Sequence, residues 1–198
     1  MPQTTNTSSP PRKRGIGFVK PNQRLTGIPW YGVEGLSPGT LLVWQVMQQR
    51  LPTRDRLRRW GLQTDEKCVL CGEEEESHLH LFFECSYSAN IWVYFASCCW
   101  NSPPENLEAC QDWITRVGND KGKSRVVLSK LLLQLTVYVL WNERNTRIFR
   151  NKEKPLEVMR RHLDKSMRNL LLSMKERRTT TNNLLLEDWY FLTSSLRM

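Results

Sequence analysis

Three cysteines and one histidine lie within 18 residues, in the pattern Cys68-x2-Cys71-x8-His80-x4-Cys85. Zinc in proteins takes four such ligands in a tetrahedron, and a Cys-x-x-Cys turn supplies two of them from one tight knuckle. A Cys3His set leaves no coordination position open for water or substrate. The pattern therefore predicts one structural Zn²⁺ ion, with no catalytic role for the metal.

The alternative interpretation of these thiols is a disulfide or a chance cluster. Disulfides belong to oxidising compartments, and the first 25 residues contain no apolar stretch of the kind that a secretory signal needs. The sequence therefore favours zinc, in an intracellular protein of the nucleus or cytoplasm that is not secreted. The remaining cysteines, Cys98, Cys99 and Cys110, are expected to be reduced and packed.

Two histidines follow the second cysteine, so the fourth ligand is a choice between them. His80 leaves four residues before Cys85, the usual separation of the second ligand pair in compact zinc units, whereas His78 leaves six. The spacing favours His80. His78 is then expected at the surface or beside the site.

Charge points to a polyanionic partner. The net charge is +9, which favours nucleic acid, although a positive surface without a partner is the simpler alternative. The loop between the ligands carries four consecutive glutamates, 73–76, which should repel phosphate. We therefore expect flanking basic segments to make the contacts. The predicted nucleic-acid-binding residues are Arg50, Arg54, Arg56, Arg58 and Arg59.

The elements that must position these residues are predicted to be mostly α-helical. Thr53 is a plausible N-cap, with its hydroxyl accepting from a first-turn N–H, and Gly61 is the expected left-handed residue after that helix. Residues 126–141 are too short and too polar for a membrane span, so a buried helix is expected and no membrane partner. The apolar spacing predicts helices over residues 41–47, 54–60, 86–100, 126–149 and 156–174.

The composition divides the chain into three parts. Residues 1–29 are predicted to be a disordered basic arm, in which the short basic run 11–14 is weak evidence for nuclear import. Residues 30–100 are the expected zinc-binding domain, and 101–198 are the expected helical C-terminal region. In that region, 118–124 is a loop, 179–183 is a linker, and the aromatic run 189–191 should dock as a short helix.

The chain contains a specific pattern made of Trp44, the run 50–57, Gly61, the runs 68–72, 76–77 and 80–85, and Trp92. This pattern resembles the zinc-binding domain of reverse transcriptases from plant LINE-type (non-LTR) retrotransposons. The resemblance covers roughly residues 41–92, and a weaker second stretch covers 141–145 with 148–149. It implies Cys68, Cys71, His80 and Cys85 as the metal set.

The chain departs from the family in lacking polymerase residues. Two-metal nucleotidyl transfer needs clustered carboxylates, and no two of the six aspartates are adjacent. There is also no glycine-rich phosphate loop. The expectation is therefore a protein that is not an enzyme.

Three functions remain open at this point. The leading one is a non-catalytic accessory domain that binds RNA or DNA through phosphate contacts, which carry no base specificity. The second is a zinc-stabilised module that binds a protein partner. The third is a functionless relic of a retrotransposon.

Overall fold

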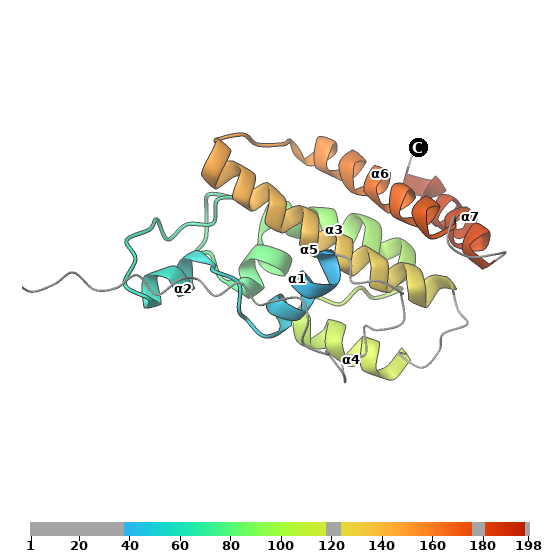
Figure 1. Ribbon diagram of the computed structural model, residues 1–198, viewed down its shortest axis with the longest axis horizontal. Coiled ribbons are helices and arrows are strands. Elements are labelled where there is room, and N and C mark those ends of the chain that lie inside the picture. Colours follow the sequence, from blue (N-terminus) through green and yellow to red (C-terminus); the bar gives the residue numbers. More distant parts are fainter. Residues whose placement is uncertain (1–37, 118–123, 176–180, 197–198) are drawn as a thin grey trace, which may run out of the picture.

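The computed structural model describes residues 38–117, 124–175 and 181–196, and these ranges are mostly helical (Figure 1). Within them, β-pairing is limited to one isolated antiparallel bridge between Lys67 and Glu75. The fold is therefore a small helical protein, as predicted. Its α-helices are α1 (Pro38–Met47), α2 (Arg54–Arg59), α3 (Ser86–Cys99), α4 (Leu107–Val117), α5 (Ser124–Arg150), α6 (Leu156–Lys175) and α7 (Thr181–Thr193). A π-helical turn η1 (His80–Glu84) and a 3-10 turn η2 (Ser194–Leu196) complete them.

The long helix α5 is the centre of the core. Helices α1, α3, α6 and α7 all pack against it, and its leucines at 128, 132 and 140 have no exposed surface. Among the described helices, α5 is long and apolar enough to cross a membrane by length and composition, but 61% of that window is buried inside the protein. A core helix passes the same test, so this is weak evidence for a membrane, and the prediction of a buried helix is confirmed.

Helix α6 is amphipathic, as its sequence predicts. Met159, Leu163 and Met167 repeat at four-residue spacing and are completely buried, which places them on the face that packs against the core. The methionine stripe is therefore part of the core. Arg161 and Lys165 are four residues apart on the opposite, exposed face.

The C-terminal segment also docks as expected, although one boundary was wrong. Trp189 is completely buried, stacks on Phe95 with ring centroids 5.9 Å apart, and donates from its indole nitrogen to Asp164. The linker predicted over 179–183 ends earlier, because α7 already begins at Thr181. The predicted arm 1–29, the basic run 11–14 and most of the loop 118–124 lie outside the described residues.

The core joins residues on both sides of residue 100. Val43 and Val46 of α1, Ile91 and Phe95 of α3, and the buried leucines of α5 belong to one apolar cluster. The boundary between a zinc-binding domain at 30–100 and a helical region at 101–198 stays a prediction.

Candidate metal centre

The first two cysteines lie in a knuckle that backbone hydrogen bonds close. The Cys68 amide donates to the Glu74 carbonyl, and the Gly72 amide donates back to the Cys68 carbonyl. Gly72 has a φ of +75°, a left-handed conformation in which a residue with a side chain is strained. These bonds and this turn bring Cys68 and Cys71 to the same side of the loop.

The other two ligands come from the two ends of one wide turn. His80 begins the π-helical turn η1, and the Cys85 amide donates to the His80 carbonyl at 2.7 Å. The i→i+5 bond makes the turn wider than an α-helical one, and such π-turns are rare and frequent at functional sites. The turn therefore directs His80 and Cys85 toward the knuckle.

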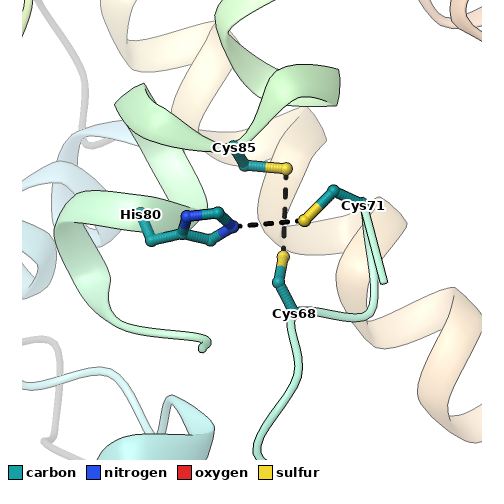
Figure 2. A group of neighbouring side chains, drawn as sticks. All are labelled: Cys68, Cys71, His80 and Cys85. Atoms are coloured by element: carbon teal, nitrogen blue, oxygen red, sulfur yellow. Dashed lines mark hydrogen bonds between the residues drawn. The ribbon is translucent and has the colours of Figure 1, made fainter. Parts of the chain in front are cut away.

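The four side chains converge on one point (Figure 2). Their ligand atoms all lie within 4.8 Å of one another, with Cys68 Sγ 3.9 Å from Cys85 Sγ and Cys71 Sγ 3.3 Å from His80 Nε2. Zn–S bonds of about 2.3 Å and a Zn–N bond of about 2.05 Å at tetrahedral angles put these pairs about 3.8 and about 3.6 Å apart. The cluster therefore suits one structural zinc ion.

The distances do not fit the disulfide alternative. A disulfide needs about 2.05 Å between the sulfurs, and all six cysteines are free thiols in the structure. Cys99 and Cys110 are buried, as expected for packed thiols, and Cys98 is half-buried. Burial raises the pKa of Cys99 and of Cys110 to about 12.

Two thiols of the cluster are hydrogen-bonded to each other. The Cys68 thiol donates to the Cys85 sulfur, and this hydrogen bond lowers the pKa of Cys85 to about 5 while it raises the pKa of Cys68. Zinc binds thiolates, so binding of the metal would release the protons that the three cysteines carry as thiols. Three thiolates and a neutral imidazole would leave the complex with one net negative charge.

His78 has a different environment from His80. Its Nε2 accepts from the Leu51 amide at 3.1 Å, so the ring proton lies on Nδ1, which faces the Thr53 hydroxyl at 3.3 Å. That hydroxyl in turn donates to Asp55. Burial lowers the pKa of His78 to about 4 and keeps the ring neutral. His78 therefore holds the segment that leads into α2, and does not face the cluster.

The start of α2 differs from the prediction. Thr53 occupies the N-cap position, but its hydroxyl accepts no hydrogen bond from the helix and donates to the Asp55 carboxylate. Glu76 caps α2 instead, with its carboxylate accepting from the Arg54 amide at 2.9 Å. The end of α2 follows the prediction, since Gly61 has a φ of +80°.

Glu76 also joins the metal loop to α5. Its side chain has no exposed surface and forms an ion pair of 2.8 Å with Arg144, which is nearly as buried. Arg144 also donates to the Pro52 carbonyl and lies over the Trp141 ring. One buried pair thus connects the loop between the ligands, the start of α2 and the central helix.

A second contact ties α5 directly to the knuckle. Arg147 donates to the carbonyls of Val69 and Leu70, the two residues between the first pair of cysteines. Glu143 orients Arg147 through a bond of 3.0 Å and also accepts from Lys154. The guanidinium therefore lies beside a metal unit whose expected charge is negative, which is favourable.

The five arginines predicted to bind nucleic acid have partners inside the protein. Arg54 bonds to the Lys67 carbonyl and Asp65, Arg58 to Glu66 and Glu75, and Arg59 to Asp55. Arg50 and Arg56 lie over the rings of Trp44 and Trp60. Their contacts with nucleic acid stay a prediction.

Site and fold together define a small helical module built around a Cys3His zinc centre. Residues 38–92 match the family model described as zinc-binding in reverse transcriptase. The match includes all four residues of the cluster, and it ends before α5. Comparisons with curated proteins and with solved structures gave no match.

Proposed function

We propose that the chain is a non-catalytic accessory domain that binds RNA or DNA and derives from the reverse transcriptase of a plant LINE-type retrotransposon. The observation that carries the proposal is the closed Cys3His cluster inside the segment that matches the reverse transcriptase zinc-binding model. A zinc centre with four protein ligands supplies folding energy and no chemistry.

The charge of the chain supports nucleic acid as the partner. A net charge of +9 attracts polyanions, and Lys or Arg contacts to phosphates release counterions. Under this proposal the zinc centre fixes the backbone that carries the basic segments. The protein works inside the cell, in the nucleus or cytoplasm where its partner is found.

The test combines metal analysis with binding at two salt concentrations. The purified full-length protein should contain one zinc ion per chain, and it should bind a mixed-sequence oligonucleotide more weakly as salt rises. The slope of log affinity against log salt is about −0.7 for each phosphate contact on a single strand and about −0.9 on duplex DNA. Binding that is indifferent to salt, or undetectable at low salt, would contradict the proposal.

One observation favours a second candidate, a module that binds a protein partner. Trp60, Leu62 and Leu79 are exposed apolar side chains close to the knuckle in sequence, while the neighbouring arginines are paired with carboxylates. Exposed apolar side chains that gather on a surface are typical of protein-binding sites. Retention of a protein partner at high salt by the zinc-loaded chain, together with failure to bind oligonucleotides, would support this candidate.

A further inference from the structure

Among the described residues, the excess of positive charge lies at the end of α5 and along α6 rather than beside the knuckle. Residues 50–76 contain six basic and seven acidic residues, so the segment around the metal is close to neutral. Residues 150–175 contain eight basic and three acidic residues. The excess charge of the described part of the chain is therefore greatest at the end of α5 and along α6.

Four cations at the end of α5 and along α6 are exposed and lack an ion pair with any described residue. Arg150 and Lys152 lie where α5 ends, and Arg161 and Lys165 lie one turn apart on the outer face of α6. The acidic residues nearby are engaged elsewhere: Glu157 pairs with Arg160, Asp164 with Arg168, and Glu153 with Arg147. We call these four cations the corner surface.

The helix dipole accounts for only part of this arrangement. A basic residue in the last turn of a helix is stabilised by the negative end of the dipole, which explains Arg150. Arg161 and Lys165 are in the body of α6, beyond the reach of either helix end. In addition, burial lowers the pKa of His162, and the charges of Lys154 and Lys165 act in the same direction while Glu143 acts against them. The local field therefore favours an anion.

An aromatic side chain accompanies the cations. Phe149 precedes Arg150 in the last turn of α5, and 76% of its surface is exposed. An exposed ring beside basic residues can stack on an unpaired base, and such stacking tolerates any sequence. Duplex nucleic acid offers no free base face to such a ring.

We propose that the corner surface of Arg150, Lys152, Arg161 and Lys165, with Phe149, binds single-stranded nucleic acid. The cations contact successive phosphates and Phe149 stacks on a base. This inference rests on the proposed nucleic-acid function, and it moves the binding site from the arginines near the knuckle to the corner of α5 and α6.

The test compares two variants of the zinc-loaded full chain that remove equal charge. The corner variant carries Arg150→Gln, Lys152→Gln, Arg161→Gln and Lys165→Gln. The matched knuckle variant carries Arg50→Gln, Arg56→Gln, Arg58→Gln and Arg59→Gln. Zinc content and far-UV circular dichroism establish that each variant is folded. The probes are mixed-sequence single-stranded RNA, single-stranded DNA, duplex DNA and anionic phospholipid vesicles.

The corner variant should lose affinity for single strands by roughly a hundredfold at about 0.15 M salt, with a slope shallower by up to about 2.8, if each cation makes one phosphate contact. The knuckle variant should bind nearly as tightly as the unaltered protein. If the knuckle variant loses the affinity and the corner variant keeps it, the corner surface is wrong while the nucleic-acid function stands. If the unaltered protein binds no nucleic acid, or binds only vesicles, both proposals fail.

The variant Phe149→Ala tests the contribution of base stacking separately from that of the phosphate contacts. It should weaken binding to single strands between about fivefold and about a hundredfold without a change in the salt slope, and leave duplex binding unaltered. The control is Phe191→Ala, because Phe191 on α7 is 79% exposed and lies outside the corner surface. Equal losses in the two variants, or no loss in either, would remove Phe149 from the site.

Discussion

His78 and His80 are two residues apart, yet they have separate roles at the metal centre. His80 Nε2 lies 3.3 Å from Cys71 Sγ, inside the cluster. His78 accepts from the Leu51 amide and keeps the segment before α2 in place. The spacing argument selected the first role for His80 because it depends on loop length. Loop length could not predict the role of His78, since the Leu51 amide that donates to it is 27 residues away in sequence.

The two histidines should respond differently to truncation. His80→Ala removes a ligand, so the variant should fail to retain stoichiometric zinc. His78→Ala should keep one zinc ion but lose about 1–3 kcal/mol of unfolding free energy, because the buried Leu51 amide loses its acceptor. Metal analysis and urea unfolding measure the two effects. Loss of zinc from the His78 variant alone would reverse the assignment.

The cysteines should also differ in how fast they react with an alkylating reagent. Burial raises the pKa of Cys99 and Cys110 to about 12, so almost none of either is thiolate near neutral pH. In the zinc-loaded protein, iodoacetamide should leave both unmodified, and chelation should release Cys68, Cys71 and Cys85 for alkylation. Mass spectrometry after timed labelling measures this, with urea-denatured protein as the control. Fast labelling of Cys110 in the folded protein would contradict the prediction.

At the scale of elements, contacts from α5 complete the metal unit. Arg144 reaches Glu76 across 68 residues, and Arg147 reaches the carbonyls of the knuckle across 77 and 78. The sequence did not predict these contacts, because the weaker resemblance at 141–145 with 148–149 says nothing about what that stretch touches. A charge pattern does not reveal which carboxylate in a run of four glutamates turns inward, and only Glu76 does so.

A double-mutant cycle can measure the energetic coupling between Glu76 and Arg144. Arg144→Ala should cost about 3–5 kcal/mol of unfolding free energy, because it leaves a buried carboxylate without its cation. Glu76→Gln combined with Arg144→Ala should be less destabilising than the sum of the single changes, since the isolated charge is removed. Urea unfolding of the four proteins measures the coupling. Additive effects would mean that the pair is not energetically linked.

The helices that could be predicted from the sequence are those with a clear apolar periodicity. Apolar periodicity located α1, α3, α5 and α6, and the break before Pro155 matches the positive φ of Asn151. The π-turn η1 was missed because five residues are too few for a period to appear. The cap of α2 was misassigned because Glu76, its acceptor, comes from another part of the chain. Helix α4 was not predicted at all.

At the scale of the whole molecule, residues outside the segment that matches the family model also stabilise that segment. Residues 38–92 contain the metal ligands, whereas Arg144 and Arg147 bond to this segment from α5 and the leucines of α5 share its apolar core. This gives the predicted boundary at residue 100 a testable consequence.

A fragment of residues 38–100 should not unfold cooperatively, because Val43, Val46 and Ile91 lose the apolar face of α5. A fragment of residues 38–196 should unfold in one zinc-dependent transition. Urea titrations followed by circular dichroism, with and without a chelator, measure this, and metal analysis records the zinc content of each fragment. A cooperative transition in the shorter fragment would show that residues 30–100 form a domain on their own.

The long reach from Arg147 to the knuckle also has a consequence for synthesis on the ribosome. Chains grow at about 5–20 residues per second, so the 77 residues between Leu70 and its donor take about 4–15 s to add. For nearly all of that time Glu76 has no Arg144, and the carbonyls of the knuckle have no guanidinium. The metal ligands are complete at Cys85, long before α5 emerges. Zinc bound at that stage would hold residues 68–85 in their folded conformation until α5 is synthesised and packs against them.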